Sequence, residues 1–412
     1  MINKPKGCYD IYGDDSKLYR QIEEAVHAYA GVYNYKYLRT PIFESSELFK
    51  RSVGESSDIV QKETYDFEDK GGREYTLRPE GTAGVVRSFI ENKFYADNVL
   101  PSKNYYMGTM YRYERPGLGR NREFTQFGVE CLGSDDPLID AEVISLSVNI
   151  LKELGLDVSV KINNLGGVED REKYKKALVE YLTPYINDLC EDCQSRIKTN
   201  PLRILDCKVD GDSEILKNVP SILDYQSNES NERFNKILNY LDYLDIDYEV
   251  DSSLVRGLDY YDYMVYELKI NDSLALGGGG RYNHLVKELG GPDTPCVGFA
   301  CGVERIINLL KEKYVDNANI DVYVMAINDE EKLKANILLQ DLRLSGIICD
   351  GDFMNKGLKG QFKDADKLNA KQLIILNSED LKKGLINVKD NLTKEENKVS
   401  EDEIVDYILG VI

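Results

Sequence analysis

The chain has 412 residues and a formal net charge of −20, a length that predicts two or three domains and a charge that argues against a general nucleic-acid coat or a membrane-surface binder. The first residues carry no apolar signal segment, no run approaches the ~18 apolar residues of a membrane span, and eight scattered cysteines predict reduced thiols. We therefore expect a cytoplasmic protein without membrane contact, although a local basic patch could still hold a specific nucleic acid.

The first 165 residues predict an antiparallel sheet flanked by helices. Apolar positions recur at helical spacing over 16–33. Pro41 lies in a predicted strand over 37–44, which indicates a sheet edge or an interface. Alternating residues and turn signals predict hairpins in the rest of this part. The other predicted elements are strands at 64–68, 75–78, 105–114, 122–132 and 158–162 and helices at 82–92 and 141–154.

The pattern changes twice after this point. Residues 170–244 are polar and mostly helical, which predicts an inserted module over 166–245. Beyond 316–319, strands and helices alternate as in a compact α/β domain over 320–412. The core would therefore consist of 1–165 and 246–315. The second part of the core is predicted to hold strands at 247–256, 260–269 and 273–277, a glycine-rich turn at 277–280 and a helix ending at 311. The last domain is predicted to hold strands at 320–327, 347–349 and 372–376 and helices at 330–345 and 358–368.

The stretch 111–130 carries the clearest chemical signal. Four arginines surround Pro116, Gly117 and Gly119 in the loop of a predicted hairpin: Arg112, Arg115, Arg120 and Arg122. Such a fork of guanidinium groups suits a polyanion such as a nucleoside triphosphate. In the strand after the loop, Gln126 and Glu130 share one face with Phe124 and Gly128, because side chains alternate with a period of two. The pattern indicates a site that joins ATP to a small polar molecule; the alternative is an exposed hairpin with a charged tip.

Two other patterns lead to no assignment. Cys190 and Cys193, with Cys207 further on, have part of a zinc spacing, but no fourth ligand is evident because the two histidines, His27 and His284, lie far away in the sequence. We therefore assign no metal ligand there. The run Gly277–Gly280 is not a phosphate loop of the usual kind, since no Lys-Ser/Thr pair follows it.

Six segments, in order, resemble the class II aminoacyl-tRNA synthetases, and within them the histidyl-tRNA synthetase family over nearly the whole chain. Three are general to the class: the strand with Pro41, the Tyr111–Glu114 hairpin that ends at Glu130, and Gly298–Arg305. Leu254–Tyr261 and Gly278–Tyr282 are more specific to the histidine enzyme, and Thr76–Thr82 also matches. The resemblance implies an α+β fold, with a helical insertion in the sheet domain and an anticodon-binding C-terminal domain. It also implies a homodimer.

The resemblance further implies a two-step reaction in which histidine reacts with ATP to give histidyl-adenylate and pyrophosphate, and tRNA(His) then accepts the histidyl group. Arg112 and Arg256 would be catalytic, holding the α-phosphate and the reacting carboxylate where charge accumulates. Arg305 would contact the γ-phosphate, with Arg120 and Arg122 as helpers. Glu114 and Phe124 would hold the adenine by hydrogen bonding and stacking. Mg²⁺ would bridge the phosphates, although the sequence has no separate motif for it.

By the same match, recognition of histidine falls to acidic and hydroxyl groups. Glu80, Thr82 and Gln126 correspond to family positions that hold the α-amino group, which suits an anion and two neutral hydrogen-bonding groups. Glu130 and Tyr261 correspond to positions that contact the imidazole, and Tyr282 would form a wall of the pocket.

Two alternative functions remain open from the sequence. Relatives that act as the regulatory subunit of ATP phosphoribosyltransferase have typically lost the catalytic arginines and the last domain, and this chain retains both, including a lysine-rich segment over 356–367 that suits tRNA. A divergent synthetase with an unusual acceptor is the other possibility. The family usually has Gln where Gly117 stands, His at Thr125, Thr-Gln at Cys8-Tyr9 and Asp-Gly at Asn283-His284.

Overall fold

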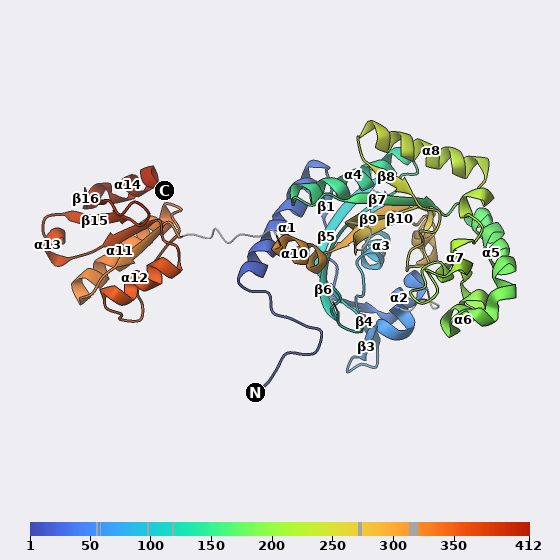
Figure 1. Ribbon diagram of the computed structural model, residues 1–412, viewed down its shortest axis with the longest axis horizontal. Helices are drawn as coiled ribbons and strands as arrows, with labels where there is room; N and C mark the ends of the chain where they lie inside the picture. The colour runs from blue at the N-terminus through green and yellow to red at the C-terminus, as the bar shows by residue number, and fades with distance from the viewer. Residues whose placement is uncertain (55–56, 58, 97–98, 118, 271–273, 313–319) are drawn as a thin grey trace. The chain divides into compact units, whose positions relative to one another are not determined.

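The structure is a computed structural model that describes residues 1–412 apart from 55–56, 58, 97–98, 118, 271–273 and 313–319. The residues 316–319, where the sequence pattern changes, therefore lie outside the described residues. The chain divides into two compact units, residues 1–314 and 315–412 (Figure 1). Each unit has its own hydrophobic core. Among the described residues, no helix is both long enough and apolar enough to cross a membrane.

An eight-stranded sheet forms the centre of the first unit, in the order β1-β5-β6-β11-β10-β9-β7-β8. Neighbouring strands are antiparallel except for the parallel pairs β1–β5 and β7–β8 at the two edges. The predicted antiparallel sheet is thus confirmed. Its strands are β1 (Lys36–Tyr37), β5 (Ser102–Tyr111), β6 (Glu123–Leu132), β7 (Ser159–Asn164), β8 (Tyr248–Val250), β9 (Asp262–Ile270), β10 (Leu274–Arg281) and β11 (Cys296–Gly302).

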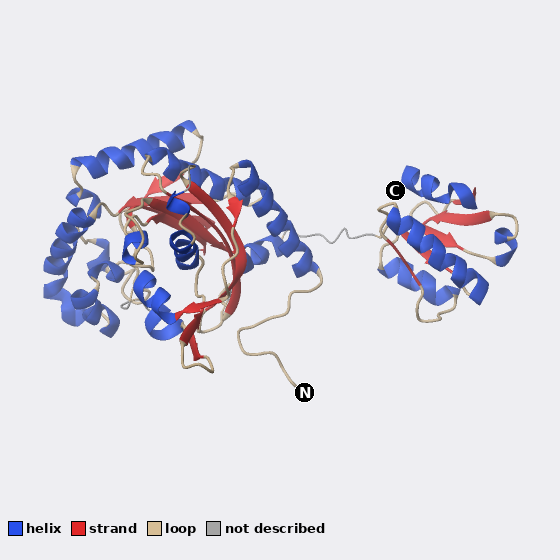
Figure 2. Cartoon of the chain, turned by 180° about the vertical axis from the view of Figure 1, so that it is seen from behind, coloured by secondary structure: helices blue, strands red, loops and turns tan. Residues whose placement is uncertain are grey.

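The two faces of this sheet are covered differently, as alternation of side chains allows. One face, with Phe127 and Phe299, packs against α1 (Asp14–Val32), α4 (Pro137–Glu153), α8 (Asn228–Tyr243) and α10 (Val303–Lys311). The other face curves around α3 (Thr82–Glu91), which Figure 2 shows nearly end-on inside the bend of the sheet. α9 (Leu285–Glu288) also packs against α3. The pocket lined by most of the predicted site residues opens on this second face.

The strand predicted over 37–44 is wrong as a single element. β1 ends at Tyr37, and β2 (Phe43–Ser45) belongs to a separate three-stranded sheet of order β2-β4-β3 with β3 (Tyr65–Glu68) and β4 (Glu74–Leu77). Pro41 has no N–H to give to a ladder. The carbonyl of Thr40 instead accepts a hydrogen bond from Arg78 Nη1 at 3.0 Å. The chain therefore leaves the large sheet here, and α2 (Ser46–Val53) follows β2.

The glycine-rich turn predicted at 277–280 is also wrong, because Gly277–Gly280 lie within β10 and pair on both sides. Glycine is needed at these positions because other groups occupy the space that a side chain would take. A Cβ on Gly278 would lie 2.9 Å from Nη1 of Arg256, and one on Gly280 would lie 3.0 Å from Cδ1 of Tyr261. β10 ends at Arg281, which is fully buried and pairs with Asp140 of α4 at 2.7 Å (Nε to Oδ1).

The segment between β7 and β8 is helical, as expected from its sequence. Its helices are α5 (Val168–Leu182), α6 (Glu191–Thr199), α7 (Glu214–Lys217) and α8. α5 and α6 share a core with the α3 side of the sheet through Tyr174, Leu178 and Cys193, whereas α8 packs on α4. The segment 247–256, predicted as one strand, is strand only at Tyr248–Val250.

The second unit is a five-stranded sheet with helices. Parallel pairing joins β12 (Val322–Met325) to β13 (Cys349–Gly351) and β14 (Gln372–Ile375). β15 (Leu385–Asp390) and β16 (Glu396–Ser400), which the sequence did not reveal, add antiparallel strands. α11 (Asp329–Leu344) begins with a capping box between Asn328 and Glu331. The remaining helices are α12 (Leu358–Lys367), α13 (Ser378–Leu381) and α14 (Ile404–Val411). The partly parallel α/β sheet is as predicted.

Candidate active site

A pocket of about 270 Å³ lies between the middle of the large sheet and the N-terminal end of α3. Its floor comes from β6, β10 and β11, and the irregular segment before β9 closes one side. Most of the residues predicted for the site line it. They are Glu80, Thr82, Arg112, Glu114, Arg120, Phe124, Gln126, Arg256, Tyr261 and Arg305.

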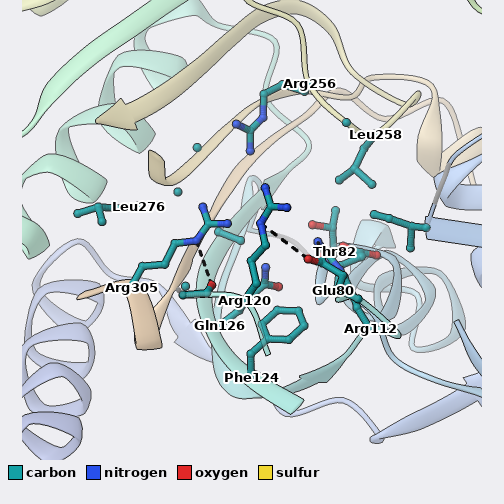
Figure 3. Close-up of a pocket in the computed structure, with 18 of the residues that line it drawn as sticks. Glu80, Thr82, Arg112, Arg120, Phe124, Gln126, Arg256, Leu258, Leu276 and Arg305 are labelled. Carbon is teal, nitrogen blue, oxygen red and sulfur yellow. Dashed lines mark hydrogen bonds and ion pairs between the residues drawn. The ribbon is translucent and has the colours of Figure 1, made fainter. Parts of the chain in front are cut away.

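One end of the pocket is lined by guanidinium groups. Arg256 and Arg305 reach it from different elements and direct their guanidinium groups into the same space, with the ring of Phe124 below them in Figure 3. Arg112 is held by a hydrogen bond from Nε to the carbonyl of Pro79 at 2.9 Å, and its Cζ lies 5.3 Å from the centre of the Phe124 ring. Arg120 approaches Glu114 at 3.9 Å. These groups can bind a polyanion together.

Electrostatics at this end favour an anion. The pKa of Arg305 is lowered by burial and by the neighbouring charge of Arg120, with Arg112 and Arg256 adding to the effect. Arg256 has an ion pair with Glu267 at 2.5 Å from Nη1, yet its buried Nε has no hydrogen-bond partner within the described chain. A buried cationic donor without a partner costs free energy. The end of the pocket is therefore arranged to gain from a bound phosphate or carboxylate.

The other end of the pocket contains acids and hydroxyls around the start of α3. Both carboxylate oxygens of Glu80 accept backbone hydrogen bonds, from Thr82 N at 2.7 Å and Ala83 N at 2.8 Å. Glu80 thus caps the helix, which is the ordinary role of an acid at a helix N-terminus. Burial raises its pKa, while these backbone donors oppose the rise. The buried Oε1 of Gln126 accepts no hydrogen bond within the described chain, so a ligand N–H can be recognised there.

Beneath this end lies a buried hydrogen-bond network that we call the acid layer, made of Thr82, Glu130 and Tyr282. Thr82 Oγ1 donates to Glu130 Oε1 at 2.6 Å, and the Tyr282 hydroxyl donates to Glu130 Oε2. Glu130 is 1% exposed. Burial raises its pKa to about 8, against the opposing effect of the hydrogen bonds from Thr82 and Tyr282. Glu130 and Tyr282 are not among the residues that line the pocket, so they support its floor in this structure.

Space for Glu130 depends on a glycine in the neighbouring strand. Gly298 pairs with Glu130 across β6 and β11, and a Cβ on Gly298 would overlap with Oε2 of Glu130. Tyr260 packs between the layer and the pocket, with ring centres 4.7 Å from Tyr261 and 5.5 Å from Tyr282. The aromatic rings exclude water from the carboxylate, which is the physical cause of its raised pKa.

Arg122, predicted as a helper for ATP, does not line the pocket. Its guanidinium carbon lies 3.9 Å from the centre of the Tyr113 ring, and its backbone N–H bonds to the carbonyl of Gly7 at 2.8 Å. Arg122 therefore joins the N-terminal segment to the hairpin, and its assignment to ATP does not agree with this position. At the tip of the same hairpin, Gly117 and Arg120 exchange two backbone hydrogen bonds of 3.0 Å.

Several pocket residues were missed by the sequence analysis. Glu304 lines the arginine end, and its Oε1 accepts hydrogen bonds from Thr125 N at 2.6 Å and from the Tyr9 hydroxyl at 2.5 Å. Glu304 directly precedes Arg305, so the matched segment already contained it. Leu258 lines the pocket from within the matched 254–261 segment. Asn121 and Ile59 also line it, and no pattern in the sequence distinguished them.

The lysine-rich segment of the second unit starts just before α12. Lys356, Lys359, Lys363 and Lys367 are all exposed, and Lys356, which precedes α12, pairs with Asp364 in that helix. The segment thus presents positive charge to solvent, with Asp364 and Asp366 close by in the sequence.

Known proteins resemble this chain over nearly its whole length. The histidyl-tRNA synthetase family matches residues 7–306, and the anticodon binding domain family matches residues 321–410. The histidine–tRNA ligase of Anoxybacillus flavithermus is 47% identical over 418 residues, covering 99% of this chain and 99% of that protein. The Bacillus subtilis enzyme of the same name is 47% identical over 412 residues, covering 98% and 97%. The crystal structure of apo histidyl-tRNA synthetase from S. aureus has a TM-score of 0.84 at 39% identity, covering 99% of this chain and 100% of that one. The chain therefore belongs to the histidyl-tRNA synthetase family.

Proposed function

We propose that this chain joins L-histidine to tRNA(His) through histidyl-adenylate, with release of pyrophosphate and AMP. The observation that carries the proposal is a single pocket with guanidinium groups at one end and the acid layer under the other. The first end suits the phosphates of ATP, and the second suits an amino acid whose side chain carries N–H groups. The match of nearly the whole chain to histidine–tRNA ligases supports this function over the regulatory role.

In the adenylation step, the histidine carboxylate attacks the α-phosphate, and negative charge grows on the phosphate oxygens. Arg256 and Arg112 would stabilise that charge from fixed positions, held by Glu267 and by the Pro79 carbonyl. Preorganised cations of this kind contribute more to the transition state than mobile ones. Arg305 and Arg120 would bind the outgoing pyrophosphate, and Phe124 and Glu114 would hold the adenine. Arg122 is left out, because its guanidinium lies over Tyr113.

Magnesium fits the donor set at the arginine end. The carboxylate of Glu304 lines the pocket there, and carboxylate together with phosphate oxygens is the environment that Mg²⁺ prefers. When bound, the ion would offset the charge of the phosphates. Glu304 would hold it, positioned by its hydrogen bonds from Tyr9 and from the backbone of Thr125.

At the other end, Glu80, Thr82 and Gln126 would bind the α-amino group, and Tyr261 and Glu130 would recognise the imidazole, with Tyr282 as the pocket wall. The unpartnered Oε1 of Gln126 supports the first assignment. The buried network around Glu130 supports the second, because each Glu130 oxygen already accepts one hydrogen bond, from Thr82 or Tyr282, and has a second lone pair that a ligand without ring N–H groups leaves unused. Comparable sites reject such ligands by roughly 10⁴–10⁵-fold.

Transfer to tRNA would involve both units. The exposed lysines of the 356–367 segment would bind phosphates of the tRNA, and the acceptor end would approach the adenylate past the hairpin at Gly117. We further propose a homodimer and a cytoplasmic location, as the family resemblance implies. Sedimentation equilibrium of the purified chain tests the dimer, with a mass of one chain, 46.9 kDa, as the contradicting result.

The decisive experiment combines two assays on the full chain. Histidine-dependent exchange between ATP and pyrophosphate measures the first step, and charging of tRNA(His) measures both steps. We expect activity in both. A chain that binds histidine but does neither would act as a regulatory subunit. Exchange without charging of tRNA(His) would indicate a different acceptor.

A further inference from the structure

Three thiols and a carboxylate meet in the helical segment, away from the pocket described above. They belong to Cys190, Cys193, Cys207 and Asp210, and their ligand atoms all lie within 4.8 Å of one another. Cys190 is half-buried, and the other three are buried. We propose that these four residues bind one Zn²⁺ ion with a structural role.

The sequence spacing of the four residues supports a metal site. The chain reads Cys190-x₂-Cys193 and then, after thirteen intervening residues, Cys207-x₂-Asp210. Two pairs of ligands, each separated by two residues, are the usual framework of zinc sites in intracellular proteins. Asp210 was not predicted as the fourth ligand, because a single aspartate in a sequence is no specific signal for a metal site. A carboxylate oxygen is also an accepted zinc ligand.

The distances between the sulfur atoms fit a shared metal better than a disulfide. Cys190 Sγ and Cys207 Sγ are 3.7 Å apart. Two sulfur ligands on one tetrahedral zinc, with Zn–S bonds of ~2.3 Å, are separated by about 3.8 Å. A disulfide requires roughly 2.05 Å and would leave Cys193 and Asp210 without a function. The four ligand atoms lie within 4.8 Å of one another. This limit is only about 1 Å longer than the separation of two sulfur ligands on tetrahedral zinc, a difference that a small rotation of a side chain closes.

The backbone around the four groups is arranged as a metal site requires. Cys190 is the N-cap of α6, and Cys193 lies in its first turn, so the positive end of the helix dipole faces the thiols. The Asp210 N–H points to Cys207 Sγ at 3.4 Å, and Asp210 Oδ2 accepts the Cys190 N–H at 3.0 Å. Such bonds fix the direction of ligand side chains. The turn closes when Gly211 N donates to the Cys207 carbonyl at 2.8 Å, and a Cβ on Gly211 would lie 2.5 Å from that oxygen.

The donor set selects zinc among the common cellular metals. Three thiolates are soft ligands, which disfavour Mg²⁺ and Ca²⁺. Four protein ligands, with no position left for a substrate, are typical of structural rather than catalytic zinc. The half-buried Cys190 provides an entry path for the ion.

The site has a consequence for the active-site pocket, because the residues between its two halves contact the segment that carries Arg256 and Tyr261. Asn200 Nδ2 donates to Asp259 Oδ1 at 2.9 Å, and Arg203 Nη2 donates to the Gly257 carbonyl at 2.5 Å. Zinc would hold residues 190–210 as one rigid loop against this segment. Removal of the ion should therefore loosen the histidine end of the pocket without changing any group that contacts substrate.

The test uses the full chain, purified without an affinity tag that binds metal and in the presence of a phosphine reductant. Elemental analysis should find one zinc per chain, and Co²⁺ added to the metal-free protein should give the absorption of thiolate ligation in tetrahedral geometry. Cys207→Ser should lose the zinc and the cobalt spectrum. Cys349→Ser, a buried cysteine of the second unit, is the matched control and should keep both.

Because Cys207→Ser could unfold the segment for other reasons, Asp210→Asn provides a milder second variant. It should keep the circular dichroism spectrum and lower zinc affinity by about 10-fold or more. Zinc-free wild-type protein should show a raised KM for histidine and a lower melting temperature, both restored by zinc. The proposal is overturned by a chain that takes up neither zinc nor cobalt with its thiols reduced, by a Cys190–Cys207 disulfide under reducing conditions, or by full zinc content in Cys207→Ser.

Discussion

The two ends of the pocket recognise their ligands by different physical means. At the arginine end the charged groups come from separate elements, and the ion pairs of Arg112 and Arg120 with Glu114 are as long as 3.9 Å. At the other end, Glu130 is 1% exposed and already hydrogen-bonded by Thr82 and Tyr282. Because the ion pairs of Arg112 and Arg120 at the first end are long, a bound polyanion would neutralise these two arginines. At the second end, Glu130 already accepts hydrogen bonds from Thr82 and Tyr282, and a ligand must fit this network. We therefore expect substitutions at the arginine end to slow the chemical step and substitutions in the acid layer to weaken the binding of histidine.

The largest effect should follow from Arg256→Ala. This change removes a fixed cation from the position where charge grows on the α-phosphate, and loss of one such group costs on the order of 10²–10³-fold in rate. Histidine-dependent exchange between ATP and pyrophosphate should fall by at least that factor while the melting temperature stays close to that of the wild type. Exchange at the full wild-type rate would remove the catalytic role assigned to Arg256.

Glu130→Gln should produce the next largest effect and should act on the other substrate. The amide keeps the volume of the side chain but cannot ionise to a carboxylate when histidine binds, and a hydrogen bond to a charged group is worth roughly 1.5–3 kcal/mol. The KM for histidine in the exchange assay should rise by about 10–100-fold, with the KM for ATP unchanged. An equal rise in both constants would contradict the division of the pocket into two ends.

The same substitution should change how stability depends on pH. The native state keeps the proton on Glu130 up to its pKa of about 8, whereas the ordinary value is 4.5. The unfolded chain therefore binds fewer protons in this window, and the stabilisation from this group is full below pH 4.5 and is lost as pH rises towards 8. The difference in unfolding free energy between wild type and Glu130→Gln should shrink by up to ~1.4 kcal/mol per pH unit. Denaturant titrations at pH 5.5, 6.5 and 7.5 measure it, and a difference that does not vary with pH would show that Glu130 ionises normally.

The smallest effect should come from Arg122→Ala, which serves as the matched control for Arg256→Ala. Arg122 belongs to the same hairpin as Arg120, but it stacks on Tyr113 and does not line the pocket. Its loss should change exchange by less than about 3-fold and should lower stability by ~1 kcal/mol through the lost cation–π contact. A decrease comparable to that of Arg256→Ala would mean that Arg122 moves into the site when ATP binds.

How far the sequence predicted this molecule depended on whether the decisive contacts were local. The period of two placed Gln126 and Glu130 on one face of β6, and β6 does present that face to the pocket and its floor. The glycines of β10 looked like a turn because the groups that fill their space, such as Arg256 and Tyr261, come from another part of the chain. Arg122 looked equivalent to Arg120 because the Tyr113 ring that holds it cannot be read from spacing.

Asp210 and the end of the strand before Pro41 also depend on contacts that are distant in the sequence. Asp210 resembles any surface acid until the turn at Gly211 brings it to the three thiols. Pro41 indicated a sheet edge or an interface, but the chain leaves one sheet at Tyr37 and enters another at Phe43, and Pro41 lies in neither strand. Residue types and spacing were sufficient to predict the chemistry of the site. The burial of its residues and the groups that hold them in place depend on tertiary contacts, which the sequence does not show.

The burial of Glu130 connects substrate binding to the exchange of a proton with solvent. A carboxyl group that is neutral in the empty pocket below pH 8 must ionise if it is to accept an imidazole N–H as a carboxylate. Binding of histidine would then release roughly one proton per site. Calorimetry in buffers of different ionisation enthalpy would detect that release as a buffer-dependent heat. Acidification of the medium would thus oppose the loading of histidine through a side chain that hardly touches water.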